Sequence, residues 1–406
     1  MNGIFAIEKP SGISSSQFLL KVQQIFNNSH VFSREIQRAT AERMRQFQEQ
    51  TGKKASKRKL RKVSKVKMGH GGTLDPLASG VLVVGVGSGT KKLSQYLSGT
   101  VKVYEAEALF GLSTTSGDVE GDILTMNSVD HLNMKDLKSV EQKFVGSLKQ
   151  TPPIYAALKM DGKPLHEYAR KGIPLPRAIE AREVNIYDLT ILPDSLSTTH
   201  NYELKRPSTE EAQDTVTELT KKSNLMLDKL YFSKEYCKSI GLENEEANVE
   251  EPIPLGEEAI QQLTSGARKF DAPLLHFKAR VSSGTYIRSL VSDIGKAMRS
   301  SSYMVKLIRC QQENWALEKN NVFSIQDFSD YEEEVWSSVL EKVMEEGSSI
   351  DVKMELENAS KELELKKKGA EAALEKDSKD AEESSELNVK VLPEEHNQNL
   401  KRPLEE

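Results

Sequence analysis

Regularly spaced apolar residues occupy only part of this 406-residue chain, because two long polar stretches interrupt them. The spaced apolar residues fall in residues 1–29, 68–193 and 270–335. A core can form only where such side chains can be buried, so we predict one folded domain with residues 30–67 and 194–269 as insertions. Residues 340–406 are rich in Glu, Lys, Ser and Ala, and we expect a charged, solvated tail there.

The patterned stretches predict both strands and helices. Apolar alternation or short apolar runs predict strands over residues 3–8, 80–86, 101–110, 154–158, 184–191 and 273–281. Apolar residues three and four positions apart predict helices over residues 14–26, 90–97 and 137–145, around Tyr168, and over residues 287–298. We find no internal repeat, and the mixture of elements predicts an α+β fold.

Positive charge is concentrated in the first insertion, although the formal net charge of the chain is −5. Between residues 34 and 67 the basic residues far outnumber the acidic ones. Such a segment can neutralise the phosphates of a nucleic acid or act as a nuclear-targeting signal, and both interpretations stay open. The candidate phosphate contacts are Lys57, Arg58, Lys59, Arg61 and Lys62.

Several classes of protein do not fit this sequence. Cys237 and Cys310 are too few for a disulfide framework, so we expect a reducing compartment. No signal peptide or membrane-spanning run is evident. The histidines lack metal-ligand spacing, and the run from Gly85 to Lys91 matches neither a dinucleotide fingerprint nor a P-loop. We therefore expect no metal, redox cofactor or bound nucleotide.

Asp75 is the leading candidate for a catalytic residue. It follows the glycine-rich run Gly69–Thr73, whose backbone can approach another chain closely, and Pro76 restricts its conformation. Tyr104 follows on a predicted strand and could stack on a base. Arg288 begins the last predicted helix, where a nearby carboxylate would stabilise it. An Arg288–Asp75 pair would lower the pKa of Asp75 by about 1 to 3 units, which suits a nucleophile.

Together these residues resemble the TruB family of pseudouridine synthases. Five segments carry the resemblance in family order: Ile7–Ser15, Gly69–Gly80, Val103–Ala106, Pro153–Lys159 and Gly284–Arg288. The resemblance implies a mixed, mostly antiparallel central sheet flanked by helices. It also implies that the enzyme isomerises the T-loop uridine of transfer RNA without a cofactor.

The resemblance also implies roles for single residues. Asp75 would attack the target nucleotide, Tyr104 would stack on the flipped uracil and assist removal of the C5 proton, and Arg288 would pair with Asp75. The remaining candidates would bind or enclose the substrate, with His70 supporting the extruded base and Leu307 packing the pocket. They are Lys9, His70, Gly72, Thr73, Tyr286 and Leu307.

The sequence departs from the family pattern at its end. Bacterial members and the guide-dependent relatives that resemble dyskerin carry an RNA-binding PUA domain, and the residues after Tyr331 lack the glycine-punctuated strands of such a domain. A stand-alone enzyme is favoured over a guide-dependent ribosomal-RNA synthase and over a non-catalytic tRNA-binding or tRNA-folding protein.

The expected partner is the T-arm of tRNA, and other RNAs with a T-arm-like loop, including mRNA, are further candidates. We expect a monomer without membrane association. Residues 53–67 favour the nucleus, and the mitochondrion and the cytoplasm are the alternatives.

Overall fold

The structure is a computed structural model. It describes residues 1–54, 56–58, 60, 64–156, 158–171, 173, 175–203, 229–264 and 271–389. Among these residues, no helix combines the length and the apolarity that a bilayer span would need.

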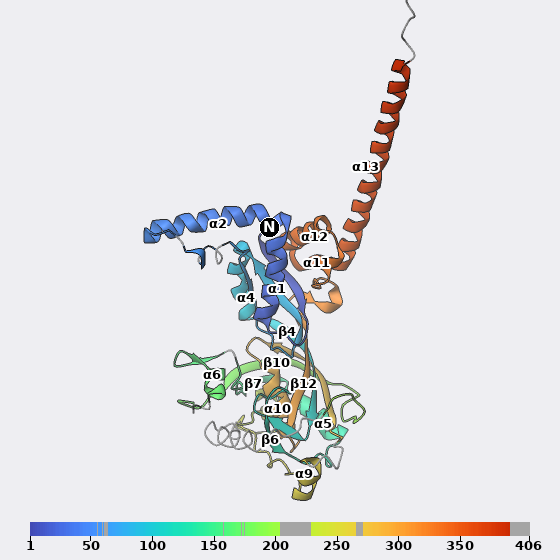
Figure 1. The fold of residues 1–406 in the computed structure, drawn as a ribbon. Coiled ribbons are helices and arrows are strands. Elements are labelled where there is room, and N and C mark those ends of the chain that lie inside the picture. The colour runs from blue at the N-terminus through green and yellow to red at the C-terminus, as the bar shows by residue number, and fades with distance from the viewer. Residues whose placement is uncertain are drawn as a thin grey trace, which may run out of the picture.

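One large mixed sheet runs through the molecule (Figure 1). Its main path is β1 (Gly3–Lys9), β3 (Ser79–Val86), β12 (Ser302–Gln312), β4 (Val101–Phe110), β11 (Leu274–Ser282), β10 (Arg182–Ile191) and β7 (Gly146–Gln150). The neighbouring strands are antiparallel except β12 and β3, which pair in parallel at Ile308–Arg309 and Ser79–Gly80. Two short strands extend it: β2 (Met68–His70) on β3 and β13 (Trp315–Ala316) on β12. The predicted mostly antiparallel mixed sheet is confirmed.

Small elements complete the description. Two hairpins lie outside the main sheet, β5 (Leu112–Thr114) with β6 (Ile123–Met126) and β8 (Lys159–Met160) with β9 (Lys163–Pro164). The remaining short helices are η1 (Gly87–Leu93), α4 (Ser94–Leu97), α6 (Leu165–Arg170), α9 (Glu257–Thr264), η2 (Leu317–Lys319) and η3 (Gly347–Ser349).

One core lies between the sheet and helices α10 (Ile287–Ala297) and α5 (Met134–Phe144). Leu290, Val291 and Ile294 of α10 are fully buried, because they follow the helical period that faces the sheet. The second insertion contributes to this core through Leu230 and Phe232, and through Cys237 of α8 (Lys234–Ser239). The expectation that the core forms without residues 194–269 is therefore wrong for this part of the second insertion.

A second core lies at the other end, between β1, β3, α1 (Ser15–Asn28), α11 (Asp327–Asp330) and α12 (Glu333–Glu346). Phe26 stacks on Phe32 with ring centroids 4.8 Å apart. Phe32 lies in the first turn of α2 (His30–Thr51), so the first insertion begins as a helix anchored in this core. Helix α2 then extends away from the body of the molecule (Figure 1).

The C-terminal region is ordered further than the sequence suggested. Leu340, Val343, Val352 and Leu356 are at most 1% exposed and belong to the second core. The predicted start of the tail at residue 340 is therefore wrong. Charged residues are frequent in the two helices that carry these side chains, so the apolar residues along one side of each were not recognised in the sequence. Helix α13 (Val352–Val389) projects from the body beyond this contact (Figure 1).

Most of the other predicted elements are confirmed, and two differ. Residues 154–158 form no strand where they are described, because Pro152 and Pro153 precede a turn there. Residues 90–97 are split between the 3₁₀ helix η1 and the short helix α4. Strand β12 was not predicted, although it holds a central place in the sheet.

Candidate active site

The loop between β2 and β3 carries Asp75, and its backbone is held on both sides. Gly71 donates its backbone N–H to the carbonyl of Val83 at 2.8 Å. The hydroxyl of Ser15 donates to the carbonyl of Leu74 and accepts from its N–H, both at 2.8 Å. The backbone N–H of Ala78 donates to the carbonyl of Asp75 at 3.1 Å and closes a turn. The carboxylate of Asp75 is thus presented from a fixed backbone and is 34% exposed.

Lys9 lies beneath this loop and is fully buried. Its Nζ donates to the carbonyl oxygens of Ala78 at 2.6 Å, Pro10 at 2.8 Å and Pro76 at 3.4 Å. Burial lowers the pKa of Lys9 to about 8, partly opposed by the negative charge of Asp75. The expectation that Lys9 binds substrate is wrong in this structure, since a fully enclosed ammonium with three carbonyl acceptors holds the loop instead.

Strand β12 supports the start of the loop through two buried side chains that the sequence pattern missed. Arg309, 1% exposed, donates from Nε to the carbonyl of Val81 at 2.7 Å and from Nη2 to that of Gly72 at 3.3 Å. Gln312 donates to the carbonyl of Gly71 at 2.6 Å. Gly72 has a φ of +131°, a conformation that L side chains rarely adopt. The signal that could have identified Arg309 and Gln312 is the presence of polar residues among the apolar residues of this strand.

The predicted pair of Arg288 and Asp75 is present. Arg288 is 6% exposed, and its Nε lies 2.9 Å from Oδ2 of Asp75. The same nitrogen lies 3.8 Å from Oδ2 of Asp118, which is itself buried. Nη1 donates to the carbonyl of Ser116 at 2.9 Å and Nη2 to that of Tyr155 at 3.4 Å. Sequence reasoning missed Asp118, because nothing in its local pattern separates it from a turn residue.

The expected lowering of the pKa of Asp75 is wrong. Burial raises this pKa above its ordinary value, and the charge of Asp118 adds to the rise. The charge and hydrogen bond of Arg288 lower it without cancelling the effect of burial. The desolvation of the ionised Asp75 carboxylate is larger than its stabilisation by Arg288, because Arg288 also interacts with the carboxylate of Asp118.

An apolar cluster includes Leu74, the residue that precedes Asp75. Tyr104 on β4 is 8% exposed and pairs in register with Arg309 on β12. It belongs to the same apolar cluster as Leu74 and Leu307. Among the predicted residues, the structure pairs Arg288 with Asp75 and includes Tyr104 and Leu307 in the cluster that contains the neighbouring Leu74.

The other predicted residues lie around this group in different ways. His70 ends β2, and burial, followed by the charge of Arg309, lowers its pKa. Its Nδ1 is buried, and no residue that the structure describes forms a hydrogen bond with it. Thr73 is exposed on the loop. Tyr286 precedes α10 and donates its backbone N–H to Oε1 of Gln150 at 2.8 Å.

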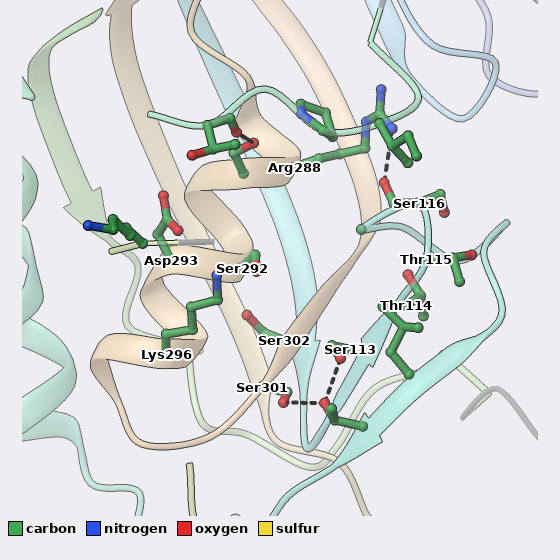
Figure 2. Close-up of a pocket in the computed structure, with 18 of the residues that line it drawn as sticks. Ser113, Thr114, Thr115, Ser116, Arg288, Ser292, Asp293, Lys296, Ser301 and Ser302 are labelled. Carbon is green, nitrogen blue, oxygen red and sulfur yellow. Dashed lines mark hydrogen bonds between the residues drawn. The ribbon is translucent and has the colours of Figure 1, made fainter. Parts of the chain in front are cut away.

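A cavity of about 650 Å³ opens beside Arg288 (Figure 2). Hydroxyl groups dominate its labelled walls, and Arg288 reaches Ser116 across one end. Lys296 and Asp293 extend into the view from α10. The hydroxyl-rich lining includes Ser113, Thr115, Ser116, Ser292, Ser301 and Ser302. Arg288 lines this space and Asp75 does not, so the cavity can receive part of a ligand beside the ion pair rather than the reacting atoms.

The structure locates part of the basic segment and can be searched for metal-binding clusters. Lys57 and Arg58 are exposed, whereas Lys59, Arg61 and Lys62 lie outside the described residues. In the part of the chain that the structure describes, no three His, Cys, Asp or Glu side chains are arranged to hold a metal ion.

Comparisons with known proteins agree with this geometry. Residues 57–205 match the model of the TruB family pseudouridylate synthase N-terminal domain. The chain is 70% identical over 352 residues to tRNA pseudouridine synthase 4 of Saccharomyces cerevisiae, covering 87% of each protein. It is 35% identical over 348 residues to tRNA pseudouridine synthase 4 of Schizosaccharomyces pombe, covering 80% of this chain and 82% of that one. A solved Cbf5-Nop10-Gar1 complex matches 81% of this chain and 54% of its own at 18% identity, with a TM-score of 0.40, too low to support an assignment.

Proposed function

Because this chain belongs to the TruB family and is a tRNA pseudouridine synthase, we propose that the site around Asp75 isomerises the uridine of the T-loop. The Arg288–Asp75 contact of 2.9 Å is the observation that carries the assignment of the site. The apolar cluster that joins Tyr104 and Leu307 to Leu74, the residue before Asp75, supports the proposal, because a flipped base requires an aromatic and apolar surface beside the nucleophile.

The reaction exchanges one bond for another and leaves the composition of the nucleotide unchanged. Asp75 attacks the target nucleotide, and the bond between C1′ and N1 breaks. The uracil rotates, C5 bonds to C1′ as the bond between Asp75 and the nucleotide breaks, the proton on C5 leaves, and N1 takes up a proton. No electrons are gained or lost, so the steps need only a nucleophile and a proton carrier.

The residues around Asp75 support these steps. Arg288 stabilises the ionised carboxylate, and its further bonds to Ser116 and Tyr155 hold it in place. Tyr104 offers a flat ring for stacking and a phenol that can carry the C5 proton. Flipping a base out of its stack costs about a few kcal/mol, and this cost is lower for a loop uridine because it has few stacking partners.

Release of tritium from C5-labelled uridine in a T-arm RNA tests the proposal directly. The wild-type protein should release tritium, and Asp75→Asn should not, because an amide cannot act as the nucleophile. Asp130→Asn is the matched control, since Asp130 is an exposed turn residue. Full turnover by Asp75→Asn would refute the mechanism, and wild-type activity that needs a guide RNA and partner proteins would favour the guide-dependent alternative.

We propose that the first insertion contacts RNA phosphates. Lys57 and Arg58 are exposed, and the segment follows α2, whose first turn is fixed in the second core by Phe32. A positively charged segment that leaves a rigid anchor can follow an RNA backbone while counterions are released.

The wider biology of the chain is also proposed. We infer a nuclear location from residues 53–67, action as a monomer, and further RNA substrates with a T-arm-like loop, including mRNA. Mapping pseudouridine in cells that lack the protein tests the substrate range: sites outside tRNA that lose the modification would support it. Light scattering of the purified protein tests the oligomeric state.

A further inference from the structure

Lys102 is a second buried lysine on the catalytic side of the sheet. It lies two residues before Tyr104 on β4, and successive even-numbered residues of this strand face the same side. Its register partner on β12 is Gln312, whose side chain reaches Gly71 of the loop. Residues directly opposite in a sheet share a face, so Lys102 lies on the side that carries the loop of Asp75.

Its surroundings differ from those of Lys9. Lys102 is 9% exposed, and its backbone pairs with the neighbouring strands, whereas its ammonium has no side-chain hydrogen bond or ion pair among the residues that the structure describes. Lys9 is 0% exposed and has three carbonyl acceptors. The Nζ of Lys102 is not one of the fully buried polar atoms that lack a partner, so it keeps contact with solvent and can receive an acceptor from a ligand.

The local charge favours an anionic ligand. Burial lowers the pKa of Lys102 to about 8, the positive charge of Arg309 adds to this, and Glu313 opposes it. Lys102 therefore stays largely protonated near neutral pH. On the neighbouring strand β12, Arg309 already donates to the carbonyls of Val81 and Gly72. The ammonium of Lys102 on β4 is therefore the donor that a ligand could use here.

We propose that Lys102 binds a backbone phosphate of the RNA next to the flipped uridine. The inference rests on the proposed function, because it places the uracil against Tyr104. Two residue steps along a strand span roughly 7 Å, within the reach of one nucleotide. A lysine binds phosphate as a compact point charge, and this contact fixes where the flipped nucleotide enters the site.

Binding of a T-arm RNA by Asp75→Asn protein isolates this contact from turnover. Adding Lys102→Met should raise Kd about tenfold and reduce the slope of log K against log salt by about 0.7 to 0.9, the value for one lost phosphate contact. Adding Lys102→Arg should preserve both. Lys306→Met is the matched control, since Lys306 lies on β12 and pairs with the carboxylate of Glu107, away from the loop.

Neutralising the RNA instead of the protein identifies the ligand atom. One methylphosphonate beside the target uridine should weaken binding about tenfold to protein with Lys102 and have little further effect with Lys102→Met. Equal losses with both proteins would overturn the proposal and point to a structural role or a contact with the base. An unchanged salt slope in Lys102→Met would overturn it as well.

Two controls keep these outcomes separate. If Lys102→Met fails to fold, as judged by circular dichroism, a methylphosphonate scan with Lys102→Arg still decides: one position beside the uridine must stand out, and a uniform profile refutes the contact. Wild-type protein that releases no tritium would refute the proposed function, whereas the binding measurements would remain interpretable.

Discussion

The ammonium of Lys9 and the carbonyl oxygen of Ala78 lie 2.6 Å apart, so the first strand of the chain fastens the loop that carries Asp75. Lys9→Met would leave this carbonyl and that of Pro10 without the lysine donor, whereas the carbonyl of Pro76 keeps the backbone N–H of Gly12 at 2.8 Å. Unpaired buried acceptors cost roughly 1 to 3 kcal/mol each. We expect a lower melting temperature and a kcat reduced at least about tenfold, with KM changed much less. A kcat equal to that of the wild type would show that the loop keeps its position without Lys9.

The pKa of Asp75 leads to opposite predictions for its two neighbours. Asp75 must be ionised to act, so activity should fall as the pH drops through its raised pKa. Arg288→Met removes the group that lowers this pKa, and the acid limb of kcat/KM against pH should move to higher pH, with a lower plateau. Asp118→Asn removes a group that raises it, and the acid limb should move to lower pH. Limbs that move in the same direction for both variants would contradict this electrostatic account.

The glycine at position 72 provides a test of loop geometry. Its φ of +131° is strained for any L residue, although a Cβ would meet no atom closer than 3.6 Å. Gly72→Ala should therefore reduce kcat through the backbone and leave RNA binding nearly unchanged. Gly99→Ala is a matched control, because Gly99 also has a positive φ, +74°, but lies in an exposed turn. Equal losses of kcat in both variants would indicate general destabilisation.

Neutralising the basic segment should weaken RNA binding without affecting chemistry. Four substitutions to Gln should raise Kd and flatten its salt dependence, whereas kcat at saturating RNA should stay within about twofold. The four are Lys53, Lys54, Lys57 and Arg58. Four exposed lysines of α13 provide the control: Lys353, Lys361, Lys366 and Lys368. A salt slope equal to that of the control would leave the segment with a targeting role alone.

Residues 53–67 also make a prediction about location. Fused to a fluorescent protein, this segment should direct it to the nucleus, and replacing its basic residues by Gln should abolish the effect. The full chain with the same replacements should leave the nucleus. Mitochondrial or cytoplasmic fluorescence of the unmodified full chain would refute the nuclear assignment.

The sequence predicted the parts of the site that have a strong local pattern. The glycine-rich loop identified Asp75, and helical spacing located Arg288 at the start of α10. It could not reveal that Asp118 shares Arg288, or that Arg309 and Gln312 support the loop, because these contacts join segments far apart in the chain. The direction of the Asp75 pKa shift was missed for the same reason, since burial depends on the assembled fold.

The cores show a similar limit. Alternation was enough to predict β4 and β11, in which buried residues alternate with partly or fully exposed ones along most of the strand. Strand β12 mixes Lys306, Arg309 and Gln312 with apolar residues, and only its tertiary contacts explain why polar side chains occur there. The helical stripe of Leu340, Val343 and Leu356 was obscured by the charged residues around it.

The parallel contact of β12 with β3 has a consequence for synthesis of the protein. Gly71 and Gly72 leave the ribosome long before the strand whose Arg309 and Gln312 hold them. A nascent chain that ends before residue 302 can contain Asp75, with Lys9 and Ser15 beside its loop, but lacks the β12 contacts that hold Gly71 and Gly72. Catalytic competence should therefore arise late in translation, and truncated products that reach the RNA would occupy it without modifying it.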